Sequence, residues 1–199
     1  MMFAANSQAA FILVDSGAPG ASSNLVPTIN NFQAQLGAAG VSSFYLGQSL
    51  SVTGASAGDF IEVDFFAAEA AYWNIFSYGP VTISNQGYQS WAERDRGSVA
   101  AFNGVQGFQF CSVDVLACLT NSANDGTRLG SYQSIGMYLT NNANTAWLLW
   151  DDSGANMDDN HDDLIVRLTY RSVPEPGTLA LLGLGLAGVA LFRRKITQA

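Results

Sequence analysis

The sequence predicts an all-β protein, an antiparallel β-sandwich of jelly-roll type followed by a single C-terminal transmembrane helix. The sandwich is predicted by roughly ten short apolar or alternating segments, which are separated by Gly, Pro, Asn and Asp turn signals. A composition of 12% charged residues with 20 glycines agrees with an exported β-rich chain. The helix is predicted because residues 179–192 have no polar face at any helical period.

The clearest strand covers residues 59–66, where Ile61 and Val63 point to one face and Glu62 and Asp64 to the other. Further strands are predicted over residues 11–15, 72–78, 81–84, 108–115, 133–139, 145–150 and 163–170. The sandwich domain is therefore expected over residues 11–172.

Four stretches interrupt or connect these strands. Residues 43–53 alternate as one strand in which Gly47 indicates a bulge. Residues 67–71 are predicted to be a connection, and residues 121–130 a loop rich in Asn, Asp and Gly. Residues 89–96, with charges of alternating sign, are predicted to form a solvated loop.

The charge distribution limits the partners of the domain. Three of the eight Lys and Arg residues and one of the 16 acidic residues lie in the tail, so residues 1–173 carry a formal charge of −10. Nucleic acid and anionic lipid both require a cationic surface, so neither is an expected partner. A divalent cation would suit this charge.

Cys111 and Cys118 are the only cysteines. In an oxidising compartment they are expected to form one disulfide across a short loop. The alternative is a pair of buried free thiols. Two thiols cannot form a structural zinc site without other ligands, and the single histidine, His161, is far away in sequence.

Residues 1–10 contain a small-residue stretch, Ser7 to Ala9, that is typical of the end of a signal peptide. They lack a charged start and an apolar core. We therefore expect these residues to be a signal-peptide remnant, with the true signal encoded upstream.

The tail, residues 173–199, combines a proline-rich triplet, an uncharged run and a basic cluster. Their residues are Pro174, Glu175 and Pro176, then Leu179 to Phe192, then Arg193, Arg194 and Lys195. From Pro176, the uncharged run would span about 25 Å as a helix, against a hydrocarbon core of roughly 30 Å. The basic cluster would hold its C-terminal side in the cytoplasm. The alternative is a buried core helix.

This tail resembles the PEP-CTERM sorting signal of bacterial surface proteins, which is recognised by the membrane transpeptidase exosortase. The resemblance covers about the last 25 residues. It implies that the protein is exported, held in the inner membrane by its tail, cut near the Pro-Glu-Pro triplet and transferred to a surface acceptor.

The densest acidic stretch, residues 151–163, contains six aspartates and His161. Like charges at this density repel one another unless a cation lies among them. Calcium is the expected cofactor, with Asp158, Asn160 and Asp162 as ligands and Asp152 as an outlying fourth. The alternative is a set of solvated charges, with Asp162 or Asp163 capping backbone N–H groups.

The same stretch resembles the closing motif of a bacterial surface domain of unknown function. The residues that match this motif are Asp159, Asp162, Asp163, Leu164 and Ile165. Residues 69–74, Glu-Ala-Ala-Tyr-Trp-Asn, resemble a second stretch of that domain. This resemblance implies a fold rather than an activity.

Exposed tryptophans could stack on sugars. The four tryptophans are Trp73, Trp91, Trp147 and Trp150, and Trp91 is the one expected to be exposed because its surroundings are polar. Aromatic residues at strand spacing are more often core residues.

No catalytic activity is expected. His161 has no Ser or Cys nucleophile motif such as Gly-x-Ser-x-Gly nearby in sequence, and nothing selects a pair of carboxylates. The sequence favours an exported structural or interaction protein of the cell envelope or extracellular matrix, processed by exosortase. The alternative is a carbohydrate-binding module of an exopolysaccharide matrix, with surface polysaccharide as its partner.

Overall fold

The computed structural model describes residues 9–15, 22–69, 72–85, 90–124, 133–152, 160–173 and 185. Within them the chain forms three antiparallel sheets and one short α-helix. The prediction of an all-β, antiparallel protein is confirmed.

The largest sheet has seven strands. In spatial order they are β2 (Ser22–Leu25), β3 (Ser43–Leu46), β12 (Ser134–Leu139), β13 (Thr145–Asp151), β14 (Leu164–Arg171), β5 (Phe60–Ala68) and β8 (Ser90–Ala100).

Two smaller sheets lie against it. The four-stranded sheet is β11 (Ala117–Thr120), β10 (Phe108–Ser112), β6 (Asn74–Tyr78) and β7 (Val81–Ser84). The three-stranded sheet is β1 (Ala10–Asp15), β4 (Gln48–Thr53) and β9 (Gly104–Val105). The helices are α1 (Gln33–Ala38) and the 3-10 turn η1 (Asn121–Ala123).

The main core lies between the large sheet and the two small ones. Its buried side chains come from all three sheets and include Phe11, Leu50, Val63, Phe76, Phe110, Trp150 and Val166. Along each of these strands, residues two positions apart point to this core, as the period of two requires. The sandwich is therefore confirmed in its coarse form. It pairs one large sheet with two small ones, whereas a jelly roll pairs two sheets of similar size.

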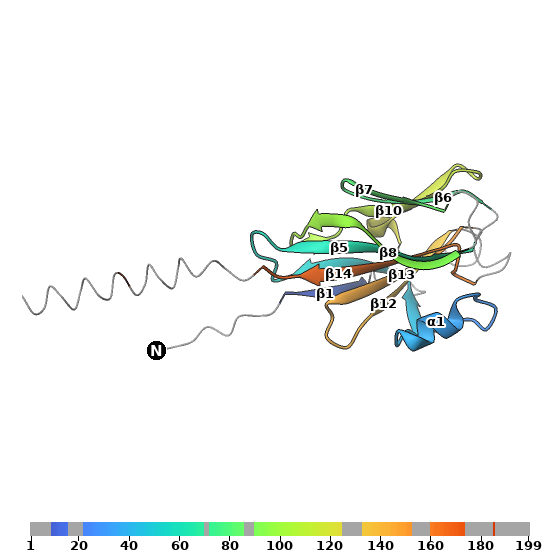
Figure 1. Cartoon of the computed structure of the whole chain (residues 1–199), viewed down its shortest axis with the longest axis horizontal. Helices are drawn as coiled ribbons and strands as arrows, with labels where there is room; N and C mark the ends of the chain where they lie inside the picture. The colour runs from blue at the N-terminus through green and yellow to red at the C-terminus, as the bar shows by residue number, and fades with distance from the viewer. Residues whose placement is uncertain are drawn as a thin grey trace, which may run out of the picture.

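A second core lies on the opposite face of the large sheet. Leu36 of α1 packs there with Phe32, Trp147, Leu149 and Ile165. Figure 1 shows α1 on one side of the large sheet and β6, β7 and β10 on the other. Because both of its faces are covered, β13 is a continuous apolar strand rather than an alternating one.

The alternation predicted for residues 59–66 is confirmed in β5. Ile61 and Val63 are fully buried in the main core. On the other face, Asp64 binds Arg167 at 2.7 Å and Glu62 binds Arg171 at 2.8 Å.

The prediction of one bulged strand over residues 43–53 is wrong. Gly47 separates β3 from β4, and these two strands belong to different sheets. Its φ of 68° lies in the left-handed region, which glycine adopts without steric cost. The glycine therefore lets the chain cross from one layer of the sandwich to the other.

The prediction of a solvated loop over residues 89–96 is also wrong. These residues lie mostly in β8, an 11-residue strand that pairs with β5 at the edge of the large sheet. An edge strand keeps one side in water, and charged residues there discourage pairing with other chains. Charges of alternating sign are therefore compatible with a strand as well as with a loop.

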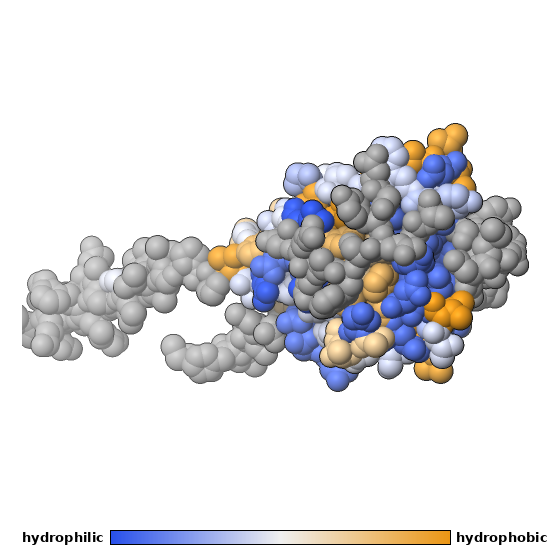
Figure 2. All heavy atoms as spheres, turned by 45° about the vertical axis from the view of Figure 1, so that its right-hand side comes forward, coloured by the Kyte–Doolittle hydropathy of each residue, from blue (hydrophilic) through white to orange (hydrophobic). Residues whose placement is uncertain are grey.

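Hydrophobic and hydrophilic residues are mixed on the visible surface of the described residues (Figure 2). On the face seen in Figure 2, hydrophobic residues form small, separate groups among hydrophilic ones. Of the predicted signal-peptide remnant, residues 1–8 lie outside the described residues and Ala10 belongs to β1.

Candidate functional site

Four aspartates near the loop between β13 and β14 are buried. Asp151, Asp152, Asp162 and Asp163 are each at most 5% exposed. The alternative that these charges are solvated is therefore wrong for these four aspartates. Asp158, a predicted calcium ligand, lies outside the described residues.

Three of these carboxylates each accept a hydrogen bond from another residue. The Asp163 carboxylate accepts the backbone N–H of Asp152 at 2.8 Å, and the Asp162 carboxylate accepts that of Asn31 at 2.6 Å. The Asp152 carboxylate accepts the side-chain amide of Asn74 at 2.6 Å. A buried carboxylate is tolerated when donors satisfy it, so these contacts hold the loop against the sandwich. The predicted capping by Asp162 and Asp163 is present.

The calcium site stays a prediction. Over the described ranges, no three His, Cys, Asp or Glu side chains are arranged to hold a metal ion. Asn160 is 6% exposed, and its backbone carbonyl accepts the side-chain amide of Asn30 at 2.8 Å. Three of the four predicted ligands, Asp152, Asn160 and Asp162, are therefore described and buried, and no calcium site is tested.

His161 lies between two other chemistry-bearing side chains. Its Nε2 is 2.9 Å from the Ser134 hydroxyl, and its Nδ1 is 3.8 Å from an Asp151 carboxylate oxygen. A serine, a histidine and an aspartate in this order form the hydrolytic triad. Here His161 and Asp151 are fully buried and Ser134 is only 7% exposed, so a substrate would have little access to the hydroxyl. The contact joins the start of β12 to the end of the acidic loop.

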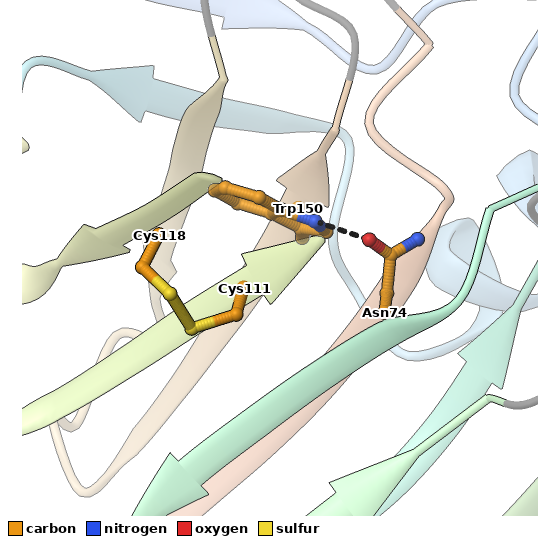
Figure 3. The surroundings of a disulfide bond; sticks show 4 residues. All are labelled: Asn74, Cys111, Cys118 and Trp150. Atoms are coloured by element: carbon orange, nitrogen blue, oxygen red, sulfur yellow. Dashed lines mark hydrogen bonds between the residues drawn. A yellow bond between two sulfur atoms is a disulfide. The ribbon is translucent and has the colours of Figure 1, made fainter. Parts of the chain in front are cut away.

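Asn74, the first residue of β6, connects the acidic loop to the four-stranded sheet. Its side-chain oxygen accepts the Trp150 indole N–H at 3.1 Å, and its nitrogen donates to Asp152, so both ends of the amide are used. Figure 3 shows the hydrogen bond between Asn74 and Trp150 beside the disulfide of Cys111 and Cys118. Asn85 extends the link, donating to the backbone carbonyl of Asp163 at 3.2 Å.

The two segments that resemble the surface domain of unknown function meet in space. The backbone N–H of Glu69 donates to the carbonyl of Asp162 at 2.9 Å. Asn74, from the same segment as Glu69, binds Asp152. Both segments therefore contribute to one buried polar network at the end of β13 and the start of β14.

The expected disulfide between Cys111 and Cys118 is present. The two residues face each other directly in the β10 to β11 hairpin (Figure 3). The ring of the neighbouring residue Phe110 stacks on Trp150 with centroids 5.3 Å apart. The disulfide therefore lies beside a core contact between the two layers.

The tryptophans do not form one exposed platform. Trp147 and Trp150 are buried in the two different cores. Trp73 is 38% exposed, and its indole N–H donates to the Ser84 hydroxyl. Trp91 lies in β8, with its backbone paired to Ala67, rather than in the predicted polar loop.

Asp59 holds the junction between the domain and its tail. Its carboxylate, 4% exposed, accepts the Tyr170 hydroxyl and the backbone N–H groups of Val173 and Ser56, the last two at 2.9 and 2.8 Å. The Tyr170 hydroxyl lowers the pKa of Asp59, and the two backbone donors act in the same direction. Asp59 therefore binds the tail as an ionised group.

The tail beyond Val173 lies outside the described residues except for Gly185. This applies to the predicted triplet, the apolar helix and the basic cluster. No helix in the described part of the chain is long and apolar enough to cross a membrane.

Comparison with known proteins identifies this tail. Residues 172–195 match the PEP-CTERM protein-sorting motif. This motif implies that the protein is exported, processed by exosortase and presented at the cell surface. The chain matched no curated protein and no solved structure.

Sequence reasoning did not identify Asp59, Asn74, Asn85 and Ser134. Each of these residues lies at or next to the end of a strand. Each forms a hydrogen bond with a residue between 11 and 114 positions away in the sequence. The only signal for Asn74 was its place in the resembling segment.

Proposed function

We propose that this chain is a structural or interaction protein of the bacterial cell envelope or extracellular matrix. One observation carries the proposal. The match to the sorting motif begins at residue 172, directly after β14, a central strand of the seven-stranded sheet. The sorting motif therefore continues directly from a strand that lies in the core of the folded domain.

The chemistry of the tail supports a definite order of events. The apolar run from Leu179 to Phe192 would hold the chain in the inner membrane, with Arg193 to Lys195 on the cytoplasmic side. Exosortase would then cut near Pro174 to Pro176 and transfer the domain to a surface acceptor. The Asp59 contact ends at Val173, so cleavage after this point leaves the folded domain intact.

The test compares the full chain with a truncation after Val173, both expressed behind the same secretion signal, in a host that contains exosortase. The truncation keeps the Asp59 contact, so the domain folds equally in both forms. We expect the truncated form in the medium and the full chain with membrane or surface material. A control in which Arg193, Arg194 and Lys195 become Gln separates membrane retention from recognition of the triplet. Equal distribution of the full and truncated chains would contradict the proposal.

A carbohydrate-binding module is the second candidate. It is favoured by an open pocket whose described polar lining residues are all uncharged. A glycan array tests this function without assuming a site, and binding that is lost on Trp91→Ala would support the residue predicted from the sequence.

A further inference from the structure

A pocket of about 410 Å³ opens at one edge of the sandwich, between β1, β3 and β12. Its polar lining residues are Ser43, Tyr45, Gln48, Tyr138 and Asn141. Pockets for small ligands are typically about 300–1,000 Å³. The space is therefore large enough for a small ligand such as one sugar ring.

Gln48 is unusual among the buried amides. It is 8% exposed, and its side-chain amide has no hydrogen-bond partner within the described part of the chain. Gln106, Asn121 and Asn124 are buried to a similar degree, and each of their side chains forms hydrogen bonds. Because Gln48 lines the pocket, the donor and acceptor of its side-chain amide are available to a ligand there.

Tyr45 provides the aromatic surface. Its side chain is 42% exposed, and it has neither a ring contact nor a hydrogen bond within the described residues. Tyrosine offers a rigid apolar face and a polar hydroxyl, and it loses little conformational entropy on binding. The apolar face suits the C–H face of a sugar ring, and the hydroxyl suits the polar edge of the ring.

The charge pattern selects the ligand class. Among the described residues, the lining contains no Asp, Glu, Lys, Arg or His, and the remaining two lining residues are Leu13 and Leu139. Asp15, the cross-strand neighbour of Gln48, puts one negative charge near the rim. Amides and hydroxyls both donate and accept hydrogen bonds, as sugar hydroxyls do, whereas an anionic ligand would find no cation among the described lining residues.

We propose that this pocket binds one residue of a neutral saccharide, with the sugar ring stacked on Tyr45 and its hydroxyls bonded to Gln48. The inference rests on the second candidate function, carbohydrate binding, and gives that function a site. The site differs from the one predicted from the sequence, because Tyr45 in β3 and Trp91 in β8 lie toward opposite edges of the seven-stranded sheet.

The experiment uses the full chain in an amine-oxide detergent, which has no sugar headgroup. Methyl glycosides of glucose, galactose, mannose and N-acetylglucosamine, and their oligosaccharides, are titrated by saturation-transfer NMR and calorimetry. We expect one neutral series to bind, with a dissociation constant on the order of 1 mM for a single sugar. Tyr45→Ala and Gln48→Leu should each weaken this binding about tenfold.

Three matched variants make the result specific. Tyr45→Phe keeps the ring, so it should bind better than Tyr45→Ala. Trp91→Ala should bind as the wild type does. Asn141→Ala changes an exposed residue of the pocket, so it tests the site even if Gln48→Leu fails to fold.

The proposal is overturned if none of these saccharides binds, or if Tyr45→Ala and Asn141→Ala both bind with wild-type affinity. Loss of binding in Trp91→Ala alone would place the site on β8 instead. Galacturonic acid binding as tightly as the neutral sugars would contradict the charge argument. Export is not needed for binding in detergent, so a failure of sorting in cells would leave this result unaffected.

Discussion

The carboxylate of Asp59 accepts a hydrogen bond from the backbone N–H of Val173, the residue that precedes the Pro-Glu-Pro triplet, at 2.9 Å. The same carboxylate accepts the hydroxyl of Tyr170 in β14. A single buried residue at the start of β5 therefore fixes the end of the last strand and the start of the tail. This contact lies at the junction between the last strand and the sorting motif, whose match begins at residue 172.

We expect Asp59→Asn to lower the free energy of unfolding by about 2 kcal/mol, because hydrogen bonds to a charged group are worth roughly 1.5–3 kcal/mol. Urea denaturation of the full chain at neutral pH measures this change. Glu62→Gln is the control, since its ion pair with Arg171 is exposed and should contribute less than about 1 kcal/mol. Equal effects of the two substitutions would refute a special role for Asp59.

The Asp59 contact also predicts a pH dependence. The folded-state pKa of Asp59 is lowered, so the contact stabilises the protein above the ordinary carboxyl pKa of about 4 and this contribution is lost as the pH falls through the folded-state value. Urea midpoints measured from neutral to acidic pH should fall more steeply for the wild type than for Asp59→Asn. Parallel curves would show that Asp59 does not titrate with unfolding.

Asn74→Ala should destabilise the protein by about 3 kcal/mol. The substitution leaves the buried carboxylate of Asp152 without its amide donor and the Trp150 indole without its acceptor. The Trp150 environment can be followed by near-ultraviolet circular dichroism. Asn103→Ala is the matched control, because the hydrogen bonds of Asn103 with Ala55 are exposed. A similar small loss in both variants would mean that the network around Asp152 contributes little.

Reduction of the Cys111–Cys118 disulfide should lower stability by about 2.5 kcal/mol, the chain-entropy value for a loop this short. Thermal melting with and without reductant measures the loss. A variant with both cysteines changed to Ser should have the melting temperature of the reduced wild type, and reductant should not change it. If reductant leaves the wild-type melting temperature unchanged, the prediction fails.

Calcium binding can be tested on the full chain by melting in calcium and in chelator. Saturating calcium, at about 100 times its dissociation constant, should add about 2.7 kcal/mol. Asp158→Asn combined with Asp162→Asn should abolish the shift. Because Asp162 also binds the backbone of Asn31, the double variant is expected to be less stable in both buffers. The difference in melting temperature between the calcium and chelator buffers therefore measures calcium binding. Superimposable wild-type melting curves in the two buffers would rule the site out.

The sequence by itself determined the class of the fold and the identity of the tail. Ile61 and Val63 alternate with Glu62 and Asp64, and this period of two holds in β5 because it depends only on strand geometry. The sorting motif is likewise a contiguous stretch, so it can be recognised without any tertiary contact. The pairing of Cys111 with Cys118 needed no more than their close spacing in the chain.

Tertiary structure decided which layer each strand joins and which polar residues matter. The sequence around Gly47 predicts a bulge within one strand. In the structure Gly47 separates two sheets, because Leu50 and Phe44 belong to different cores. The charged residues near Trp91 form a strand only because β5 offers an unpaired edge. Asp59, Asn74 and Gln48 carry no local signal, since the importance of a buried polar group depends on partners supplied by distant parts of the chain or, for Gln48, on a pocket that only the folded edge creates.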